Sequence, residues 1–375
     1  MTITIPAHAM RASIAVAATA GKSPAMDKKV AEAIRAQMAR KTPLAEATET
    51  TPVPAPVTAY IPPAPTTGQV MFSDIVKHKV DYDFPVSVLE NASLHPNMQG
   101  MVPTIDPYYL PDSAALFKIL RAFEDNDTTL IHGPMGCGKS QLVKHACALT
   151  GRAYIRINMT EDAESSVIFG TLVAKDGSTV WEDGPATEAW LYGAVLNVDE
   201  YDVTPPGVAM GFQWMLENNG RLFLKEKPGA AVDKIIPPHL QSRLVMCGNT
   251  VGQGDSTGNF AGVSPQNSAF MDRFRTSIRM DYLLPKVEAG MIVGATALNA
   301  RTADQMVQFA GLCRLAYKQQ TLNLPVSPRT LLNWATKCTT HGMKGALHVA
   351  YTDKLTDSQL KIAMEAYVKV FGASA

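Results

Sequence analysis

Short runs of apolar residues recur along the chain after residue 71. The clearest runs lie at residues 130–131, 154–157, 194–198 and 244–247. Segments with helical spacing separate several of these runs, and this alternation is typical of a parallel sheet with helices on both faces. The pattern therefore predicts an α/β core built on a parallel sheet.

Two further segments have the pattern of β-hairpins inserted into this core. Residues 169–181 contain two stretches of mixed polar and apolar residues on either side of Asp-Gly at 176–177, a pair that favours a tight turn. Residues 221–239 contain two short apolar runs on either side of Pro-Gly at 228–229. We expect two hairpin insertions.

Strand patterns stop after Pro285, and helical spacing takes over. The expected helices cover residues 303–319, 329–336 and 356–371. They predict a small helical C-terminal domain, or lid, at 286–375, which follows the α/β core at 71–285.

The first 70 residues differ in composition from the rest. Residues 26–40 have the spacing of a short helix, and residues 42–67 are rich in Pro, Ala and Thr, which favours an extended linker. We expect residues 1–70 to be a largely flexible extension. The short helix could be a docking tail for a neighbouring subunit, although a disordered extension is the simpler interpretation.

Composition and charge narrow the range of functions that the chain could have. The 375 residues include 34 Lys+Arg and 34 Asp+Glu, so the chain lacks the basic excess that is typical of nucleic-acid binders. The five cysteines form no CxxC pair, and the eight histidines show no metal-ligand spacing. No apolar run reaches the roughly 18 residues of a membrane span. We expect a cytoplasmic protein with reduced thiols.

Residues 133–140 match the phosphate-loop pattern GxxxxGK[ST], between an expected strand at 128–132 and an expected helix at 139–149. Glycines allow the backbone N–H groups to turn toward phosphate oxygens, and the helix N-terminus adds positive charge. Lys139 can reach the β- and γ-phosphates of ATP, and the Ser140 hydroxyl can bind Mg²⁺. The predicted nucleotide-binding residues are Gly133, Pro134, Met135, Gly136, Cys137, Gly138, Lys139, Ser140, Gln141 and Asp199.

Cys137 occupies a variable position of this loop. A thiol near a helix N-terminus can have a lowered pKa, so redox sensitivity is a secondary hypothesis.

Polar residues follow two of the later apolar runs. Asp199 and Glu200 follow the run at 194–198, where Asp199 is expected to bind Mg²⁺ through a water and Glu200 to orient and polarise the attacking water. An acidic pair that merely caps a strand is the alternative. Asn249 follows the next run and is expected to hold the water or the γ-phosphate, although Asn after a strand is often only a turn former.

These motifs, in this order, resemble the AAA+ ATPases. More closely, the chain is similar to the MoxR-type branch and, within it, to the small ATPase subunits of cobaltochelatases. The resemblance covers about residues 100–340 and is carried by VPTID at 102–106, VDEYD at 198–202, GNTVGQGD at 248–255, MDRF at 271–274 and SPRT at 327–330. We expect the lid to diverge from the family after Thr330, and residues before Met71 have no counterpart in it.

The resemblance implies a ring, expected to be a hexamer, with ATP and Mg²⁺ at the subunit interfaces. It implies that Arg273 is the arginine finger, with Arg275 as a rival, and that Arg329 contacts the nucleotide from the lid. A positioned guanidinium accelerates phosphoryl transfer because charge develops on the transferred group.

The expected activity is hydrolysis of ATP to ADP and phosphate, used to remodel a partner protein. The resemblance implies a partner with a von Willebrand factor A domain, as in metal insertion. A nucleic-acid translocase ring is the alternative, and neutral charge counts against it. A nucleotide switch without hydrolysis is the third hypothesis, and Glu200, Asn249 and Arg273 argue against it.

Overall fold

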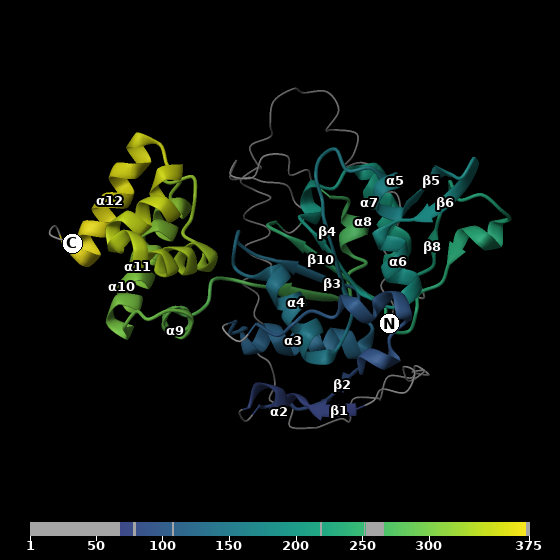
Figure 1. Cartoon of the computed structure of the whole chain (residues 1–375), viewed down its shortest axis with the longest axis horizontal. Helices are drawn as coiled ribbons and strands as arrows, with labels where there is room; N and C mark the ends of the chain where they lie inside the picture. The colour runs from purple at the N-terminus through teal and green to yellow at the C-terminus, as the bar shows by residue number, and fades with distance from the viewer. Residues whose placement is uncertain are drawn as a thin grey trace, which may run out of the picture. The chain divides into compact units, whose positions relative to one another are not determined.

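A computed structural model describes residues 68–77, 80–106, 109–217, 220–250, 252 and 266–372 of the chain (Figure 1). All of them belong to one of the two units of the chain, Ile61–Ala375. The expected helix at 26–40 and the linker at 42–67 lie outside the described residues.

The core of the described chain is a five-stranded sheet in the order β11-β3-β10-β7-β4, and every pair of neighbours is parallel. Its strands are β3 (Thr129–His132), β4 (Tyr154–Asn158), β7 (Val195–Asp199), β10 (Arg243–Gly248) and β11 (Thr276–Arg279). The predicted parallel sheet is confirmed, with the four apolar runs as β3, β4, β7 and β10. Strand β11 was not predicted, because Ile278 is the one apolar residue in its sequence.

Helices cover both faces of this sheet (Figure 1). One face packs against α3 (Ser113–Asp125) and α4 (Lys139–Thr150), and the other packs against α5 (Ser165–Phe169), α6 (Pro185–Tyr192) and α7 (Pro206–Leu216). The remaining short elements of the core are β1 (Gly68–Met71), α2 (Phe72–Val76), β2 (Pro85–Val88), α8 (Ser268–Met271) and the 3-10 turns Asn91–Ser93, Pro96–Met101, Tyr201–Val203 and Ala231–Lys234.

The alternation of side chains along β7 sets the direction of its last residue. Leu196 and Val198 lie in the hydrophobic cluster with α6 and α7, whereas Val195 lies in the cluster with α3 and α4. Because successive side chains of a strand point to opposite faces, Asp199 belongs to the face of Val195. The strand therefore directs this carboxylate toward α4.

The register of the sheet separates two groups of predicted site residues. Gly248 lies opposite His132, and Cys247 lies opposite Asp199, so β3, β7 and β10 end at the same edge. The phosphate loop follows β3 at this carboxyl edge. Strand β11 begins with Thr276 opposite Thr129, so the residues that precede it lie at the amino edge.

Both predicted hairpins are present. β5 (Gly170–Lys175) pairs with β6 (Ser178–Asp183) along its whole length, and the turn contains Asp176 and Gly177 with φ of 51° and 77°. The second hairpin is much shorter, because β8 (Leu222–Phe223) and β9 (Ile235–Ile236) share only two residue pairs.

The chain after β11 is helical in its described part, as expected. Its helices are α9 (Pro285–Ala295), α10 (Ala300–Lys318), α11 (Pro328–Ala350) and α12 (Asp357–Phe371), with a 3-10 turn at Thr352–Lys354. They enclose a hydrophobic cluster of their own around Trp334 and Phe309. α11 is much longer than the predicted helix at 329–336 and continues through a kink at Gly342, where φ is 64°. The domain limits 71–285 and 286–375 remain predictions.

No helix in the described part of the chain is both long enough and apolar enough to cross a membrane.

Candidate functional site

The phosphate loop requires glycine at three positions for identifiable reasons. Gly136 and Gly138 have φ of +74° and +99°, in the left-handed region that disfavours other residues. A side chain on Gly133 would collide with the carbonyl oxygen of Met280, and one on Gly136 would lie 2.5 Å from the Cβ atom of Ser327. The loop is therefore tightly enclosed by later parts of the chain.

The Lys139 ammonium group is buried inside this loop. It donates to the carbonyl oxygens of Gly133 at 2.9 Å and Pro134 at 3.2 Å, and to the Asn249 Oδ1 atom at 2.9 Å. These three acceptors match the three donors of an ammonium group. The structure thus brings the predicted phosphate-binding lysine into contact with Asn249, 110 residues further along the chain.

Other loop residues surround this centre. Met135 is exposed at the loop, and its carbonyl oxygen accepts a hydrogen bond from the Tyr282 hydroxyl at 3.0 Å. Gln141 lies in the first turn of α4 and is half-buried.

The Asp199 carboxylate meets the phosphate loop at the first turn of α4. Its Oδ2 atom accepts a hydrogen bond from the Ser140 hydroxyl at 2.6 Å. The same oxygen accepts from Arg156, through Nε at 2.9 Å and through Nη2. A hydroxyl and a carboxylate in contact are the oxygen ligands that Mg²⁺ prefers beside nucleotide phosphates. The residues present therefore fit Mg²⁺ with ATP.

Glu200 follows directly and has an unusual backbone. It is exposed, and its φ of 57° and ψ of 40° place it in the left-handed region, where a non-glycine residue is uncommon. Among the described residues its carboxylate has no hydrogen-bond partner. Such strain persists where the surrounding structure enforces it, often at functional sites.

Asp202 is a central residue of the site for which the sequence predicted no role. It is 1% exposed, and its Oδ2 atom accepts from the backbone N–H groups of Asn249 at 2.9 Å and Thr250 at 3.0 Å. The Tyr201 hydroxyl donates to the Thr250 carbonyl oxygen at 3.1 Å. These bonds tie the turn after β7 to the turn after β10. The only signal in the sequence was the position of Asp202 within VDEYD.

Tyr109 also approaches the phosphate loop. Its ring lies 5.1 Å from the His145 ring on α4, and its hydroxyl would be 3.7 Å from a side chain on Gly138. Nothing in the pattern of the sequence singled out this residue.

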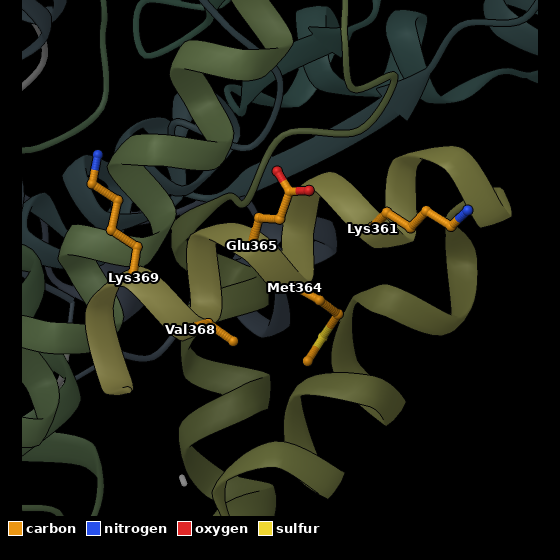
Figure 2. A pocket seen from close by; sticks show the side chains of 5 residues that line it. All are labelled: Lys361, Met364, Glu365, Val368 and Lys369. Carbon is orange, nitrogen blue, oxygen red and sulfur yellow. The ribbon is translucent and has the colours of Figure 1, made fainter. Parts of the chain in front are cut away.

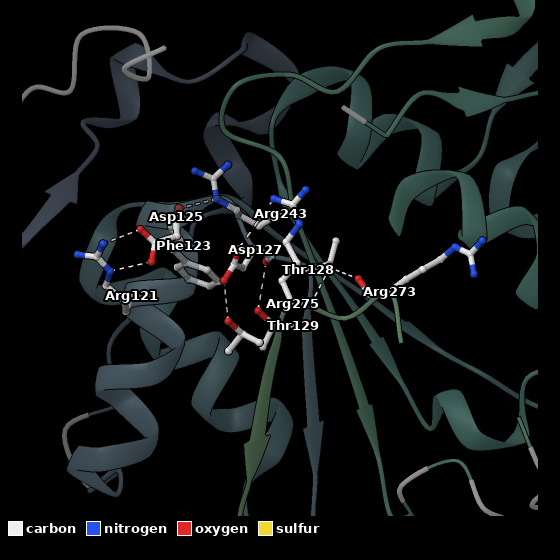
Figure 3. Close-up of polar contacts among 10 residues, drawn as sticks. Arg121, Phe123, Asp125, Asp127, Thr128, Thr129, Arg243, Arg273 and Arg275 are labelled. Carbon is white, nitrogen blue, oxygen red and sulfur yellow. Dashed lines mark hydrogen bonds and ion pairs between the residues drawn. The ribbon is translucent and has the colours of Figure 1, made fainter. Parts of the chain in front are cut away.

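Arg273 and Arg275 lie away from this centre, at the amino edge of the sheet. The Thr128 hydroxyl donates to the Arg273 carbonyl oxygen at 3.0 Å, which fixes the segment against the start of β3 (Figure 3). The Arg275 guanidinium faces Asp127 at 4.0 Å, whereas the Arg273 guanidinium points away from that cluster (Figure 3). Arg273 instead donates to Glu217 at 2.7 Å.

Arg329 is exposed in the first turn of α11. The helix begins at Ser327, whose hydroxyl accepts from the Thr330 N–H at 3.2 Å. Because Ser327 is the residue that encloses Gly136, the first turn of α11 lies beside the phosphate loop.

Cys137 does not have the acidic thiol that its place before a helix suggested. Its side chain is 4% exposed, and burial raises the pKa of the thiol above its ordinary value. The structure therefore contradicts the redox hypothesis, because desolvation of a thiolate outweighs the attraction of Lys139.

Other candidate sites contribute nothing to this chemistry. The described residues contain no group of three or more His, Cys, Asp or Glu side chains that could hold a metal ion. A hollow of about 530 Å³ lies along α12, lined by Lys361, Met364, Glu365, Val368 and Lys369 (Figure 2). None of the predicted site residues lines it.

Two known families match the chain. Residues 128–274 match the AAA domain of the dynein-related subfamily, and residues 288–370 match the CbbQ/NirQ/NorQ C-terminal family. The second match corrects the expectation that the lid diverges from known relatives after Thr330. Sequence reasoning missed it because helical lids carry few short motifs.

Curated relatives cover most of this chain. The aerobic cobaltochelatase subunit CobS of Sinorhizobium is 33% identical over 281 residues, which are 72% of this chain and 83% of the relative. NorQ of Paracoccus denitrificans is 26% identical over 70% of this chain and 93% of its own length. The denitrification regulatory protein NirQ of Pseudomonas aeruginosa is 25% identical over 68% of this chain and 94% of its own length.

Among solved structures, the RuvB Holliday junction branch migration motor of Thermotoga maritima matches with a TM-score of 0.40. It is 14% identical and covers 71% of this chain and 72% of the motor. At that level the likeness says nothing about function.

We predict that Asp202→Ala destabilises the protein, because it leaves the backbone N–H groups of Asn249 and Thr250, in the turn after β10, without their acceptor. The expected loss is about 3 kcal/mol of unfolding free energy, measured by urea denaturation. Asp202→Asn keeps an acceptor oxygen and is the matched control, with an expected loss of about 1 kcal/mol. Equal stability of the alanine variant and the wild type would contradict the role of Asp202.

Proposed function

We propose that this chain, which belongs to the MoxR-type AAA+ ATPases, binds Mg-ATP and hydrolyses it to ADP and phosphate. The observation that carries this proposal is the convergence of Lys139, Ser140, Asp199 and Asn249 within hydrogen-bond contact. An acidic pair that only capped a strand would have no reason to meet the phosphate loop.

Each residue of the site has a proposed role. The backbone N–H groups of the loop and Lys139 bind the β- and γ-phosphates. Ser140 and Asp199 would hold Mg²⁺, which neutralises charge on the phosphate oxygens. Glu200 orients the attacking water and accepts its proton, and its exposed carboxylate is free for this task. Asn249, which accepts from Lys139, orients the γ-phosphate or the water.

The position of Arg273 favours action on a neighbouring subunit. It precedes β11 at the amino edge of the sheet, whereas the phosphate loop lies at the carboxyl edge. Strand β3 spans four residues between them, or about 13 Å at 3.3 Å per residue. We propose that Arg273 completes the site of the next subunit in a ring, taken to be a hexamer, and that Arg329 contacts the nucleotide from the lid. Both arginines are paired within their own chain, Arg273 with Glu217 and Arg275 with Asp127, and Arg273 is preferred because it occupies the family's position.

The partner is proposed from the relatives. CobS is named as a cobaltochelatase subunit and NirQ as a denitrification regulatory protein, so the relatives share no single named role. We propose that this chain remodels a partner protein, with a von Willebrand factor A domain as the expected partner type and metal insertion as one outcome. The five free cysteines support a cytoplasmic location. Zero net charge disfavours the nucleic-acid translocase.

We predict that Glu200→Gln binds Mg-ATP with near wild-type affinity but hydrolyses it at least about 100-fold more slowly, because the water loses its base. Phosphate release measures the rate, and a fluorescent ATP analogue measures binding. Glu365→Gln, on the exposed face of α12, is the control and should keep full activity. Unchanged turnover in Glu200→Gln would remove the catalytic assignment.

We predict that Arg273→Ala lowers hydrolysis by about 10³-fold while each subunit still binds ATP. A mixture with Glu200→Gln should recover activity above either variant alone, since the Glu200→Gln subunits supply Arg273 to intact neighbouring sites. Arg275→Ala is the control, with an expected loss under about tenfold. Absence of recovery in rings shown to contain both variants would refute action between subunits.

We predict that Glu200→Gln, loaded with Mg-ATP and used as bait in an extract of the native source, captures a protein with a von Willebrand factor A domain. The variant should remain in its ATP-bound state and retain its partner, which mass spectrometry identifies. The same bait without nucleotide is the control. Recovery of DNA and DNA-processing proteins alone would favour the translocase instead.

A further inference from the structure

Arg156 lies on β4, the edge strand beside β7, and its side chain reaches across to the catalytic face. It stands opposite Asn197 in the parallel register, and Asp199 lies two residues beyond Asn197 on the same face of the sheet. Both Nε and Nη2 of the guanidinium donate to the Asp199 Oδ2 atom. The sheet therefore directs a permanent positive charge at the carboxylate expected to hold Mg²⁺.

The Asp199 carboxylate needs a compensating charge. Its side chain is only 8% exposed, and a buried carboxylate is costly unless it is paired and hydrogen-bonded. The Ser140 hydroxyl contributes a hydrogen bond but no charge. In this structure Arg156 is the cation that balances Asp199.

The Arg156 side chain is 51% exposed, so the guanidinium can turn into water once another cation compensates Asp199. A divalent cation held by Ser140 and, directly or through a water, by Asp199 would compete with Arg156 for the charge of the same carboxylate. Two cations beside one carboxylate repel each other strongly in a partly buried site.

We propose that Arg156 is a resident counter-ion of Asp199, and that Mg²⁺ must displace it before the Mg-nucleotide is bound. Displacement raises the Mg²⁺ concentration that the site requires, because Mg²⁺ must replace the Arg156 guanidinium beside Asp199. This inference rests on the proposed function in that Mg²⁺ arrives with a nucleotide.

A competing role for Arg156 predicts the opposite sign. If Arg156 bound a phosphate oxygen together with Mg²⁺, its removal would weaken nucleotide binding and leave the Mg²⁺ requirement unchanged or raised. A displaced counter-ion predicts instead that its removal lowers the Mg²⁺ requirement. The Mg²⁺ concentration at half-maximal binding therefore separates the two roles.

The test compares Arg156→Gln with wild type by titrating MgCl₂ against a fixed concentration of fluorescent ADP analogue. The half-maximal Mg²⁺ concentration should fall by about tenfold in Arg156→Gln. Lys144→Gln removes one positive charge from the exposed side of α4 and is the matched control, with an unchanged requirement. An unchanged or increased Mg²⁺ requirement in Arg156→Gln overturns the proposal.

A second measurement uses neither nucleotide nor turnover. In EDTA the melting temperature of Arg156→Gln should lie about 3 °C or more below wild type, because Asp199 loses its counter-ion. MgCl₂ alone should restore more of that stability in the variant than it adds to the wild type. Equal stabilisation of both by Mg²⁺ counts against displacement. This arm tests the inference even if the wild type hydrolyses no ATP, which would refute only the proposed function.

Arg156→Lys covers the case in which Arg156→Gln does not fold. Lysine keeps the charge but supplies a single point contact, so its Mg²⁺ requirement should lie between those of wild type and the counter-ion-free site. A requirement at or above the wild-type value in Arg156→Lys overturns the proposal.

Discussion

The site depends on one buried carboxylate at the end of β7. Asp199 meets the Ser140 hydroxyl from the phosphate loop and the Arg156 guanidinium from β4, so three elements converge on one oxygen atom. A charge in so little water is tolerated only when its partners are fixed in place. The alternation of β7 and the packing of α4 against the sheet provide that fixation. The proposed nucleotide chemistry and the proposed exchange of Arg156 for Mg²⁺ both depend on this fixed position of the carboxylate.

Hydrogen bonds extend this centre in two directions. Asp202 connects the turn after β7 to Asn249, and Lys139 connects Asn249 to the loop, so the three strand ends form one polar network. On the other side, the Tyr282 hydroxyl donates to the Met135 carbonyl oxygen while the Arg314 guanidinium lies 3.9 Å from the Tyr282 ring centre. These contacts join the phosphate loop to the C-terminal helices.

The C-terminal side of this connection is anchored by a buried ion pair. Arg314 on α10 binds Glu288 on α9 through two hydrogen bonds of 2.8 and 2.9 Å, and Glu288 is 2% exposed. Arg314 also donates to the Val326 carbonyl oxygen, one residue before Ser327 and the start of α11. The same arginine thus connects Tyr282 to the helix that carries Arg329. Such bidentate pairs fix geometry as well as charge.

The sequence by itself determined the kind of fold and which residues were candidates for the site. The phosphate loop, the Asp199-Glu200 pair and Asn249 could be recognised because each follows a short apolar run, and parallel strands bring such ends to one edge. Local sequence could not reveal β11, because Ile278 is its one apolar and its one buried residue. Nor could it assign Asp202, Tyr109 or Arg156, since a polar residue looks the same wherever its partner lies. Tertiary structure alone decided which donors meet Asp199, because the Arg156 guanidinium and the Ser140 hydroxyl lie 43 and 59 positions away from it in the chain.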